Sequence, residues 1–336
     1  MALLSLGLRF KANVEALNMS ETVGNVTRHR RVPVIVSEKD GFRLIYVPAI
    51  SGESLAHAYQ VNLVEVAKVL YDGKPPVDPW SLRGEFVKFT DRAHLTDTLK
   101  SVISSKKSTE EKQHEFEKTA IVESIVADIG GFLYAENPPV RRTSVFQVGY
   151  AIPVEEFIEA TAIEAQVHTR QAVVGLEAEA ERQAQMLYYV EVASAIYGVT
   201  FNIDLDGIGR TSMVRVEQVV NEEERKKRIK VAIGALALTL GEALFGAKKS
   251  RFNPVLEVLD AVAVISHPLG FTITPPQKKD YIKDTLKRAT KYVEILRELG
   301  VSEGYVKIAT YGYKDYKNNK ESLEELFNWI LSEIGI

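Results

Sequence analysis

The sequence predicts an α+β fold with a ferredoxin-like core, and three observations lead to this prediction. Alternating apolar residues and apolar helical stripes follow one another in the order β-α-β-β-α-β once insertions are set aside. Hydrophobic residues make up 46% and charged residues 26% of the 336 residues, as in globular proteins. Residues 72–139 differ in character and interrupt this order. RNA-recognition domains share such a core.

The first strand is predicted over residues 4–15, where apolar and polar residues alternate. Its polar positions include Arg9 and Lys11, so we expect a half-buried strand with a partly basic outer face. The apolar runs 32–36 and 42–47 then flank Lys39-Asp40-Gly41, which predicts a β-hairpin with the basic residues 28–31 at its base.

A strand-to-helix passage follows in the sequence YVPAISGESLAHAYQ, residues 46–60. We expect Ser51 to be the N-cap of a helix whose first backbone N–H groups lack helical partners and could bind an anion. An ordinary capped helix with Glu53 in its first turn would explain the same residues. His57 either faces a ligand near the helix start or is simply solvated.

Residues 72–139 are predicted to form a mostly helical insertion that ends at Gly130-Gly131, and residues 140–150 return to a strand. Alternation over residues 163–170 predicts a strand with His168 and Arg170 on its outer face and Val167 facing inward. Residues 171–185 separate it from a strand at 186–205 and are expected to form the long tip of a β-hairpin.

The last third of the chain alternates helices and strands. Asn221 and Glu224 predict the start of a helix whose apolar stripe runs from Ile229 to Leu244. A buried strand (255–266), a helix (282–296), a short strand (306–309) and a final helix (323–334) are expected to follow.

Composition excludes several classes of function. The chain has no cysteine, which excludes disulfides, thiolate chemistry and cysteine-based zinc sites and fits the cytoplasm, where we expect the protein. Its six histidines show no metal-ligand spacing, and we expect neither a metal nor a cofactor. The glycines before Lys248 resemble a phosphate-binding loop, but the lysine is displaced by one residue and no strand precedes them. No apolar run is long enough for a membrane helix.

The net charge is −3, so a uniform basic field for nucleic acid is absent, yet several local basic clusters exist. They could line a polyanion groove if the fold brings them together. The first strand lacks the aromatic residues with which RNA-recognition domains stack bases. If RNA binds, we therefore expect backbone contacts and little sequence preference.

Several motifs, in this order along the chain, resemble the archaeal branch of the CRISPR-associated DevR family, the backbone subunits of subtype I-A Cascade. These motifs are NVEALN (13–18), ETVGN (21–25) leading to His29-Arg30, the 46–60 stretch, DIGGFLY (128–134), PVRRTS (139–144), EAQVH (164–168) and KSRF (249–252).

The resemblance implies a modified RNA-recognition fold. A palm (residues 1–71 and 140–336) would carry helical fingers (72–139) and a β-hairpin thumb (171–185). It also implies a non-catalytic antiviral subunit that polymerises along the spacer of CRISPR RNA. Its partners would be CRISPR RNA, target DNA through the guide, neighbouring copies of itself and other Cascade subunits, with no membrane.

The resemblance gives the basic and polar candidates a role in holding RNA. A phosphate would bind at the helix start, and the other side chains would line the groove or bind sugar and phosphate oxygens. These candidates are Asn18, Asn25, Arg28, His29, Arg30, Ser51, Gly52, Ser54, His57, Arg141, Arg142, His168, Arg170, Lys248, Lys249 and Arg251.

Two alternatives remain at this point. One is an endoribonuclease of the same superfamily that processes CRISPR RNA with His29 or His57 as acid or base, although the glycines at residues 300–312 are only scattered. The other is a metabolic enzyme that binds a small phosphorylated substrate at the helix start. The acidic thumb, with Glu177, Glu179 and Glu181, leaves open whether its tip contacts RNA or the next subunit.

Overall fold

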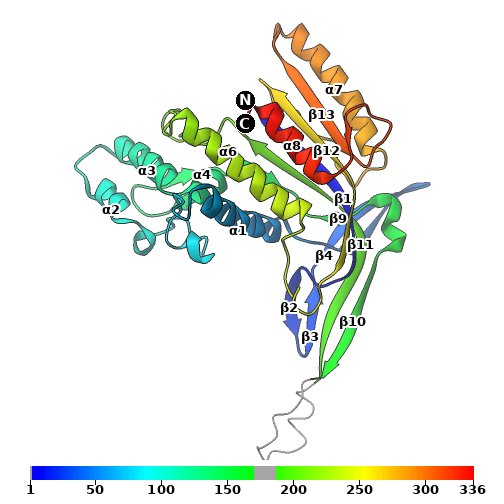
Figure 1. The fold of residues 1–336 in the computed structure, drawn as a ribbon. Coiled ribbons are helices and arrows are strands. Elements are labelled where there is room, and N and C mark those ends of the chain that lie inside the picture. The colour runs from blue at the N-terminus through cyan, green and yellow to red at the C-terminus, as the bar shows by residue number, and fades with distance from the viewer. Residues whose placement is uncertain (1, 170–186) are drawn as a thin grey trace, which may run out of the picture.

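A computed structural model describes residues 2–169 and 187–336. The chain forms a mixed α+β fold around one large, mainly antiparallel sheet (Figure 1), in which only the pairs β3–β11 and β13–β14 among the described strands are parallel. The expected thumb, residues 171–185, and Arg170 lie outside the described residues. No helix in the described parts is long and apolar enough to cross a membrane.

Strand β1 (Leu3–Glu15) is the centre of the sheet and pairs with β11 and β12, antiparallel to both. The sheet runs in the order β14-β13-β12-β1-β11-β3-β2, and β8, β9 and β10 pair with the other edge of β11. The remaining bounds are β2 (Met19–Val23), β3 (Val26–His29), β8 (Phe146–Val148), β9 (Ile152–Pro153), β10 (Ala162–Thr169), β11 (Leu187–Asp204), β12 (Val255–His267), β13 (Tyr305–Tyr311) and β14 (Asn319–Lys320).

Helices cover both faces of the sheet. The helices α1 (Gly52–Leu70), α6 (Glu222–Leu236) and α8 (Leu323–Ile334) share the main core with Leu4, Leu6 and Leu8 of β1. On the opposite face, α7 (Tyr281–Glu298) packs on Val262 and Val264 of β12. These helices and strands agree closely with the predicted elements.

The prediction of a half-buried first strand is wrong, because both faces of β1 are covered. A Cβ at Gly7 would meet Ile273 and Pro276, which lie over the second face. The predicted surface cation Arg9 is buried there: its Nε donates to Pro276 O at 2.8 Å, and its Nη1 lies 2.8 Å from Glu156 Oε1. The alternation predicted which residues share a face of the strand. It could not predict that the segment with Ile273 and Pro276 covers the second face.

The predicted hairpin around Lys39-Asp40-Gly41 is confirmed as β4 (Arg31–Glu38) and β5 (Gly41–Pro48), which form a separate two-stranded sheet. Residues 72–139 contain several helices and contribute to a second, smaller core, which Val140 also joins. Their elements are η1 (Ser81–Arg83), η2 (Arg92–His94), α2 (Asp97–Ser104), α3 (Thr109–Glu123), α4 (Ile125–Gly130) and β6 (Phe132–Tyr134).

Three further expectations fail. The predicted strand 140–150 is divided into β7 (Val140–Arg142), which pairs with β6, and β8, which pairs with β11. Between them Ser144 Oγ accepts from Phe146 N at 3.2 Å, a local turn that interrupts the strand. The apolar stripe after Asn221 does not continue to Leu244, because α6 ends at Leu236 and a π-helical turn (Ala237–Gly241) follows. On β10 the predicted faces of two residues are reversed: Val167 is 57% exposed rather than inward, and His168, expected on the outer face, is half-buried.

Candidate nucleic-acid interface

The start of α1 is an N-cap, as predicted. Ser51 Oγ accepts a hydrogen bond from Ser54 N at 3.2 Å. A Cβ at residue 52 would lie 2.9 Å from Val148 O, so only glycine fits at this close approach of two backbones. Ser51 and Gly52 are buried, whereas Glu53 is exposed and Ser54 half-buried. A ligand can therefore reach the first turn from the Glu53–Ser54 side but not the Ser51 hydroxyl, which the cap already uses.

Asn18 connects this helix start to Arg30. Its Oδ1 accepts from Ser51 N at 2.8 Å and from Arg30 Nε at 3.0 Å, and its backbone O accepts from Arg30 N at 2.8 Å. Asn18 itself is buried, so it does not lie on the surface where we expected it to bind sugar or phosphate oxygens. Its role in the structure is to hold a half-buried guanidinium beside the first turn of α1.

His29 does not line an open surface, contrary to the prediction. Only 2% of it is exposed, and its Nε2 lies 2.6 Å from Glu15 Oε1. Its Nδ1 lies 2.9 Å from Arg30 O, so both ring nitrogens face oxygen atoms of the protein. Glu15 also accepts from Leu17 N and Tyr197 Oη, each at 2.7 Å. Burial, and then the charge of Glu15, raise the pKa of Tyr197 well above its usual value.

Asn25 and Arg28 lie on the β2–β3 hairpin and are both exposed. Asn25 Nδ2 donates to Leu187 O at 3.3 Å, which ties this hairpin to β11. Arg28 Nη1 is 3.8 Å from Glu21 Oε1, a loose surface pair that costs little to exchange for a phosphate. These two side chains therefore remain accessible to a ligand.

A second group of candidates surrounds an aromatic cluster formed by His168, Tyr188 and Phe252. The His168 ring stacks on Tyr188 at 5.3 Å with an interplanar angle of 28°, and Phe252 meets His168 edge-on at 5.3 Å. Arg251 Nη1 donates to Tyr188 Oη at 3.4 Å. The cluster thus combines ring faces with an exposed guanidinium, a combination suited to bases and phosphates.

The loop that carries Lys248, Lys249 and Arg251 is attached to the first group through Leu17. Ala247 N donates to Leu17 O at 2.8 Å. Gly246 lies against Leu17 with φ +86°, where a Cβ would be 2.5 Å from Leu17 Cδ2. Partial burial, and then the charge of Arg251, lower the pKa of Lys248. Lys249 Nζ donates to Ala243 O at 2.9 Å.

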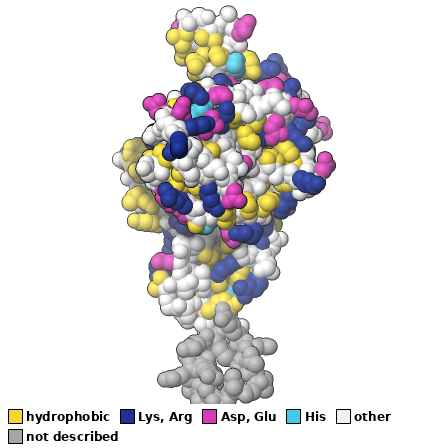
Figure 2. All heavy atoms as spheres, turned by 90° about the vertical axis from the view of Figure 1, so that its left-hand side faces the viewer, with side chains coloured by type: hydrophobic (Ala, Val, Ile, Leu, Met, Phe, Trp, Pro, Cys, Tyr) yellow, Lys and Arg dark blue, Asp and Glu magenta, His cyan; other side chains and the backbone are white. Residues whose placement is uncertain are grey.

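Leu17 and Asn18 therefore hold two predicted groups next to each other, the α1 start with Arg30 and the 246–252 loop with its aromatic cluster. In Figure 2, dark blue side chains gather with yellow and cyan ones on the narrow part of this face, above the grey residues. His57 lies one turn into α1, exposed, with its ring edge-on to Phe86 at 5.1 Å.

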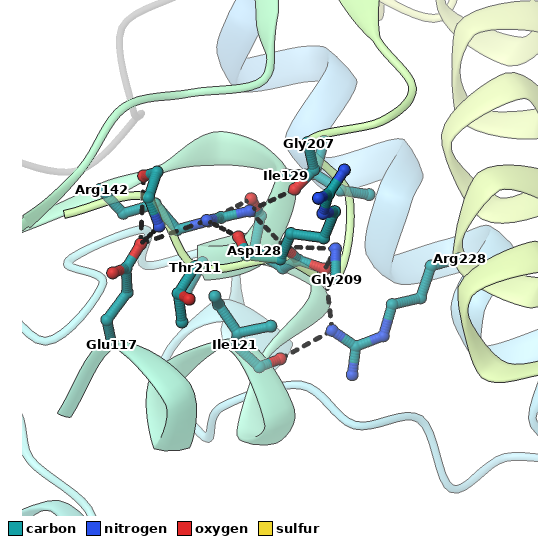
Figure 3. A network of polar contacts seen from close by, with 12 residues as sticks. Glu117, Ile121, Asp128, Ile129, Arg142, Gly207, Gly209, Thr211 and Arg228 are labelled. Carbon is teal, nitrogen blue, oxygen red and sulfur yellow. Dashed lines mark hydrogen bonds and ion pairs between the residues drawn. The ribbon is translucent and has the colours of Figure 1, made fainter. Parts of the chain in front are cut away.

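Arg141 and Arg142 belong to a different part of the fold. Arg141 is exposed on β7, but Arg142 is buried, and its Nη2 lies 2.6 Å from Asp128 Oδ1 and 2.9 Å from Gly207 O. Figure 3 shows Arg142 and Arg228 directed at Asp128 from separate elements, and Arg228 Nη1 lies 2.9 Å from Asp128 Oδ2. The prediction that Arg142 lines a groove is wrong, because its guanidinium is fully engaged in the interior.

Sequence reasoning missed the aromatic members Tyr188 and Phe252. Phe252 stands in the KSRF motif, and Tyr188 pairs directly with His168 in the β10–β11 register, so cross-strand pairing was the available signal. Among residues 2–169 and 187–336, no group of three or more His, Asp or Glu side chains could hold a metal ion.

The chain is similar to known CRISPR-associated proteins. A family model described as CRISPR-associated negative auto-regulator DevR/Csa2 matches residues 6–286. CRISPR-associated aCascade subunit Cas7/Csa2 2 of Saccharolobus solfataricus is 38% identical over 300 residues, covering 88% of each chain. CRISPR-associated protein Cas7/Csa2 1 of the same organism is 37% identical over 275 residues, covering 81% of each chain.

Solved structures show the same fold at low identity. A chain of a CRISPR RNA-guided surveillance complex aligns with a TM-score of 0.53 and 12% identity, covering 99% of both chains. A chain of such a complex in a pre-nicking state gives a TM-score of 0.53 and 10% identity, covering 98% of this chain and 99% of that one.

Proposed function

The chain belongs to the DevR/Csa2 family of CRISPR-associated proteins, and on this premise we propose that it is a backbone subunit of Cascade in antiviral defence. Copies of the chain bind along the spacer of CRISPR RNA and present its bases to target DNA. Other Cascade subunits complete the complex. The subunit itself catalyses no reaction.

The observation that carries this proposal is the link made by Asn18. One amide oxygen holds the first turn of α1 and the Arg30 guanidinium together. Leu17 places the Lys248–Arg251 loop and the aromatic cluster beside them. Helix-start N–H groups and guanidinium groups bind phosphate regardless of sequence, and ring faces accept any base. Such a surface suits a guide whose sequence is read by base pairing.

We propose that the accessible members of the predicted set contact RNA: Asn25, Arg28, Arg30, Ser54, His57, Arg141, His168, Lys248, Lys249 and Arg251. Gly52 is buried and shapes the helix start. Asn18 and Ser51 position these groups. Tyr188 and Phe252 join the set as stacking residues. Arg170 stays a proposal from the sequence, since it lies outside the described residues.

The proposed architecture is a ferredoxin-like palm (1–71 and 140–336) with helical fingers (72–139) and a thumb whose tip is residues 171–185. The antiparallel order β12-β1-β11-β8 supports the palm, because α1 and α6 share one core over this sheet and β1-α1-β8-β11-α6-β12 gives the expected chain order. The β10–β11 pairing supports a thumb that starts from these two strands.

The endoribonuclease alternative loses its first candidate residue. His29 is buried and both of its ring nitrogens face groups of the protein, so it cannot reach an RNA hydroxyl. His57 is exposed, and the Phe86 ring that it meets edge-on offers no hydrogen bond that would orient the imidazole for proton transfer.

The test is RNA binding by the purified chain at several RNA lengths and salt concentrations. We expect affinity that grows with RNA length, is indifferent to sequence and falls steeply with salt. Arg251→Ala should reduce the magnitude of the slope of log K against log salt by about 0.7 for each RNA phosphate that the variant no longer neutralises, one per bound copy. The matched control is Arg297→Ala, an exposed arginine on α7. Saturable binding of a small phosphorylated molecule, without length-dependent RNA binding, would instead favour the metabolic enzyme.

A further inference from the structure

The β4–β5 hairpin presents an apolar face to solvent. Ile35, Phe42, Leu44 and Tyr46 are 72%, 78%, 59% and 69% exposed. The register pairs Ile35 with Leu44 and places Tyr46 and Phe42 on either side of Leu44, opposite Pro33 and Ser37, so all four share one face. Clusters of large exposed apolar side chains on a soluble protein mark interaction sites.

The structure holds this face outward. Val36 and Val47, on the other face, are buried. Ser37 N donates to Glu155 Oε1 at 2.8 Å, Arg43 Nη2 lies 3.3 Å from Glu159 Oε1, and Arg31 Nη2 lies 2.9 Å from Glu191 Oε1. A two-stranded hairpin is marginally stable by itself, so these contacts fix its orientation.

The same chain has an apolar groove of about 440 Å³ between α1, α6 and α8. Its apolar lining includes Leu70, Ile233, Leu238, Phe327 and Leu331, and Lys230, Glu242 and Glu324 lie at its edge. The hairpin turn carries Lys39 and Asp40, both exposed. The charges are complementary, because Lys39 can meet a glutamate of the edge and Asp40 can meet Lys230.

The hairpin and the groove lie on different sides of the molecule. In Figure 1, α1 and α6 lie to the left of β4, and α8 lies above it. None of the described hairpin residues lines the groove of its own chain. A contact between two different surfaces on separate copies is head-to-tail, and it repeats from copy to copy as an open filament unless its rotation closes a ring.

We propose that the β4–β5 hairpin of one copy seats its apolar face in the α1–α6–α8 groove of the next copy. This proposal rests on the proposed function, in which RNA aligns neighbouring copies, and it names the protein surfaces that join them. RNA supplies the alignment, and the hairpin supplies the contact that makes each added copy bind more tightly than the first.

The first test separates RNA binding from assembly. The variant Phe42→Asp with Leu44→Asp and the control Leu299→Asp, whose side chain is 66% exposed on another surface, are compared on a short RNA and on one several times longer. On the short RNA, which holds one copy, both should bind within twofold of wild type. On the long RNA, the hairpin variant should bind at least tenfold more weakly and form no multi-copy species in sedimentation velocity.

Two outcomes have separate meanings. If the hairpin variant assembles on long RNA like wild type, the inference is overturned. If wild-type protein binds neither RNA, the proposed function fails, and the hairpin contact is tested instead by self-association of the free protein at high concentration. Loss of self-association in the hairpin variant alone supports the contact. Self-association of the hairpin variant like that of wild type overturns it.

The second test locates the seat and uses the absence of cysteine from the chain. Protein with Leu44→Cys and Leu238→Cys is assembled on long RNA and treated with a short bis-maleimide. A ladder of cross-linked multimers is expected. Leu299→Cys with Leu238→Cys is the control and should stay monomeric on a denaturing gel. If Leu44→Cys with Leu238→Cys gives no ladder although the protein assembles, the groove does not bind the hairpin and the proposal fails.

Discussion

Asn18 Oδ1 accepts a hydrogen bond from Arg30 Nε at 3.0 Å, and this bond sets a guanidinium beside the start of α1. The same oxygen accepts from Ser51 N, so the side chain of Asn18 holds together Arg30, which follows β3, and the start of α1. A cation and a helix N-terminus both attract an anion, and here Asn18 positions both of them.

Asn18→Ala should both destabilise the protein and weaken RNA binding. It leaves the buried Ser51 N–H without its acceptor, which costs about 1–3 kcal/mol in the free energy of unfolding. Urea denaturation measures this cost, and filter binding measures RNA affinity. Asn18→Asp is the companion variant: it keeps both acceptor bonds but adds a negative charge, so stability should be largely retained while RNA affinity falls. Equal RNA affinity in Asn18→Asp and wild type would contradict an anion site here.

Arg142→Ala should act on stability rather than on RNA. It leaves Asp128 short of one counter-ion and Gly207 O short of a donor in the interior, at a cost of about 3–5 kcal/mol. Arg141→Ala, at the exposed neighbour, should change stability by less than about 0.5 kcal/mol. Thermal unfolding of the two variants side by side checks this contrast. A direct role of Arg142 in RNA binding would be supported instead if Arg142→Ala unfolds like wild type but binds RNA weakly.

Tyr188→Ala should lower RNA affinity by about 1–3 kcal/mol through loss of a stacking surface. Tyr188→Phe keeps the ring and removes only the hydroxyl that accepts from Arg251 Nη1, so it should retain most of the affinity. Fluorescence anisotropy on homopolymeric RNAs measures both. Identical losses in the two variants would assign the effect to the hydroxyl and remove the stacking role.

Asp260→Asn should stabilise the protein at neutral pH. Burial of Asp260 raises the pKa of its carboxyl above the usual value, although the hydrogen bond from Tyr281 Oη at 2.6 Å opposes this. At pH values between the unfolded and the folded pKa, Asp260 therefore keeps a proton in the folded protein that it has lost in the unfolded chain. Stability falls as pH rises from the unfolded pKa, about 3.9, through the folded pKa, and is flat above it.

Asp260→Asn should remove that pH dependence. The free energy of unfolding should be higher than that of wild type at pH 7 and equal to it below pH 3. Urea titrations at a series of pH values check it, with Asp284→Asn as a control, since its ion pair with Lys278 lowers the pKa of Asp284. A gain that is the same at every pH would contradict the burial argument.

Much of the fold could be predicted, because helices and strands leave local signals. The Ser51 cap, the Asn221 cap and the Lys39-Asp40-Gly41 turn are all where the sequence placed them. The family resemblance carried by the motifs is confirmed by the family model. Interior position was much harder to predict: a charged residue such as Arg9 or Arg142 looks like a surface cation until its distant partners are known.

The candidate site could be predicted only in part for the same reason. Asn18, Arg30 and Ser51 lie far apart in the chain, and the sequence indicated each as a ligand group rather than as neighbours. His29 follows the exposed Arg28 in an alternating strand, and its burial depends on Glu15 of another strand. The aromatic cluster depends on the pairing of Tyr188 with His168, which a search for RNA-recognition consensus positions does not examine.

The Asp128 network has a consequence for how such proteins can diverge. Asp128 sits in the helical insertion, while Arg228 and the turn at Gly209 belong to the main body, and all three meet in the interior. Deleting the insertion would leave two buried guanidinium groups without their shared carboxylate. The insertion therefore cannot be exchanged freely between relatives. A chimera that takes residues 72–139 from a relative needs an acid at the position of Asp128, because otherwise the buried Arg142 and Arg228 destabilise the main body as well as the insertion.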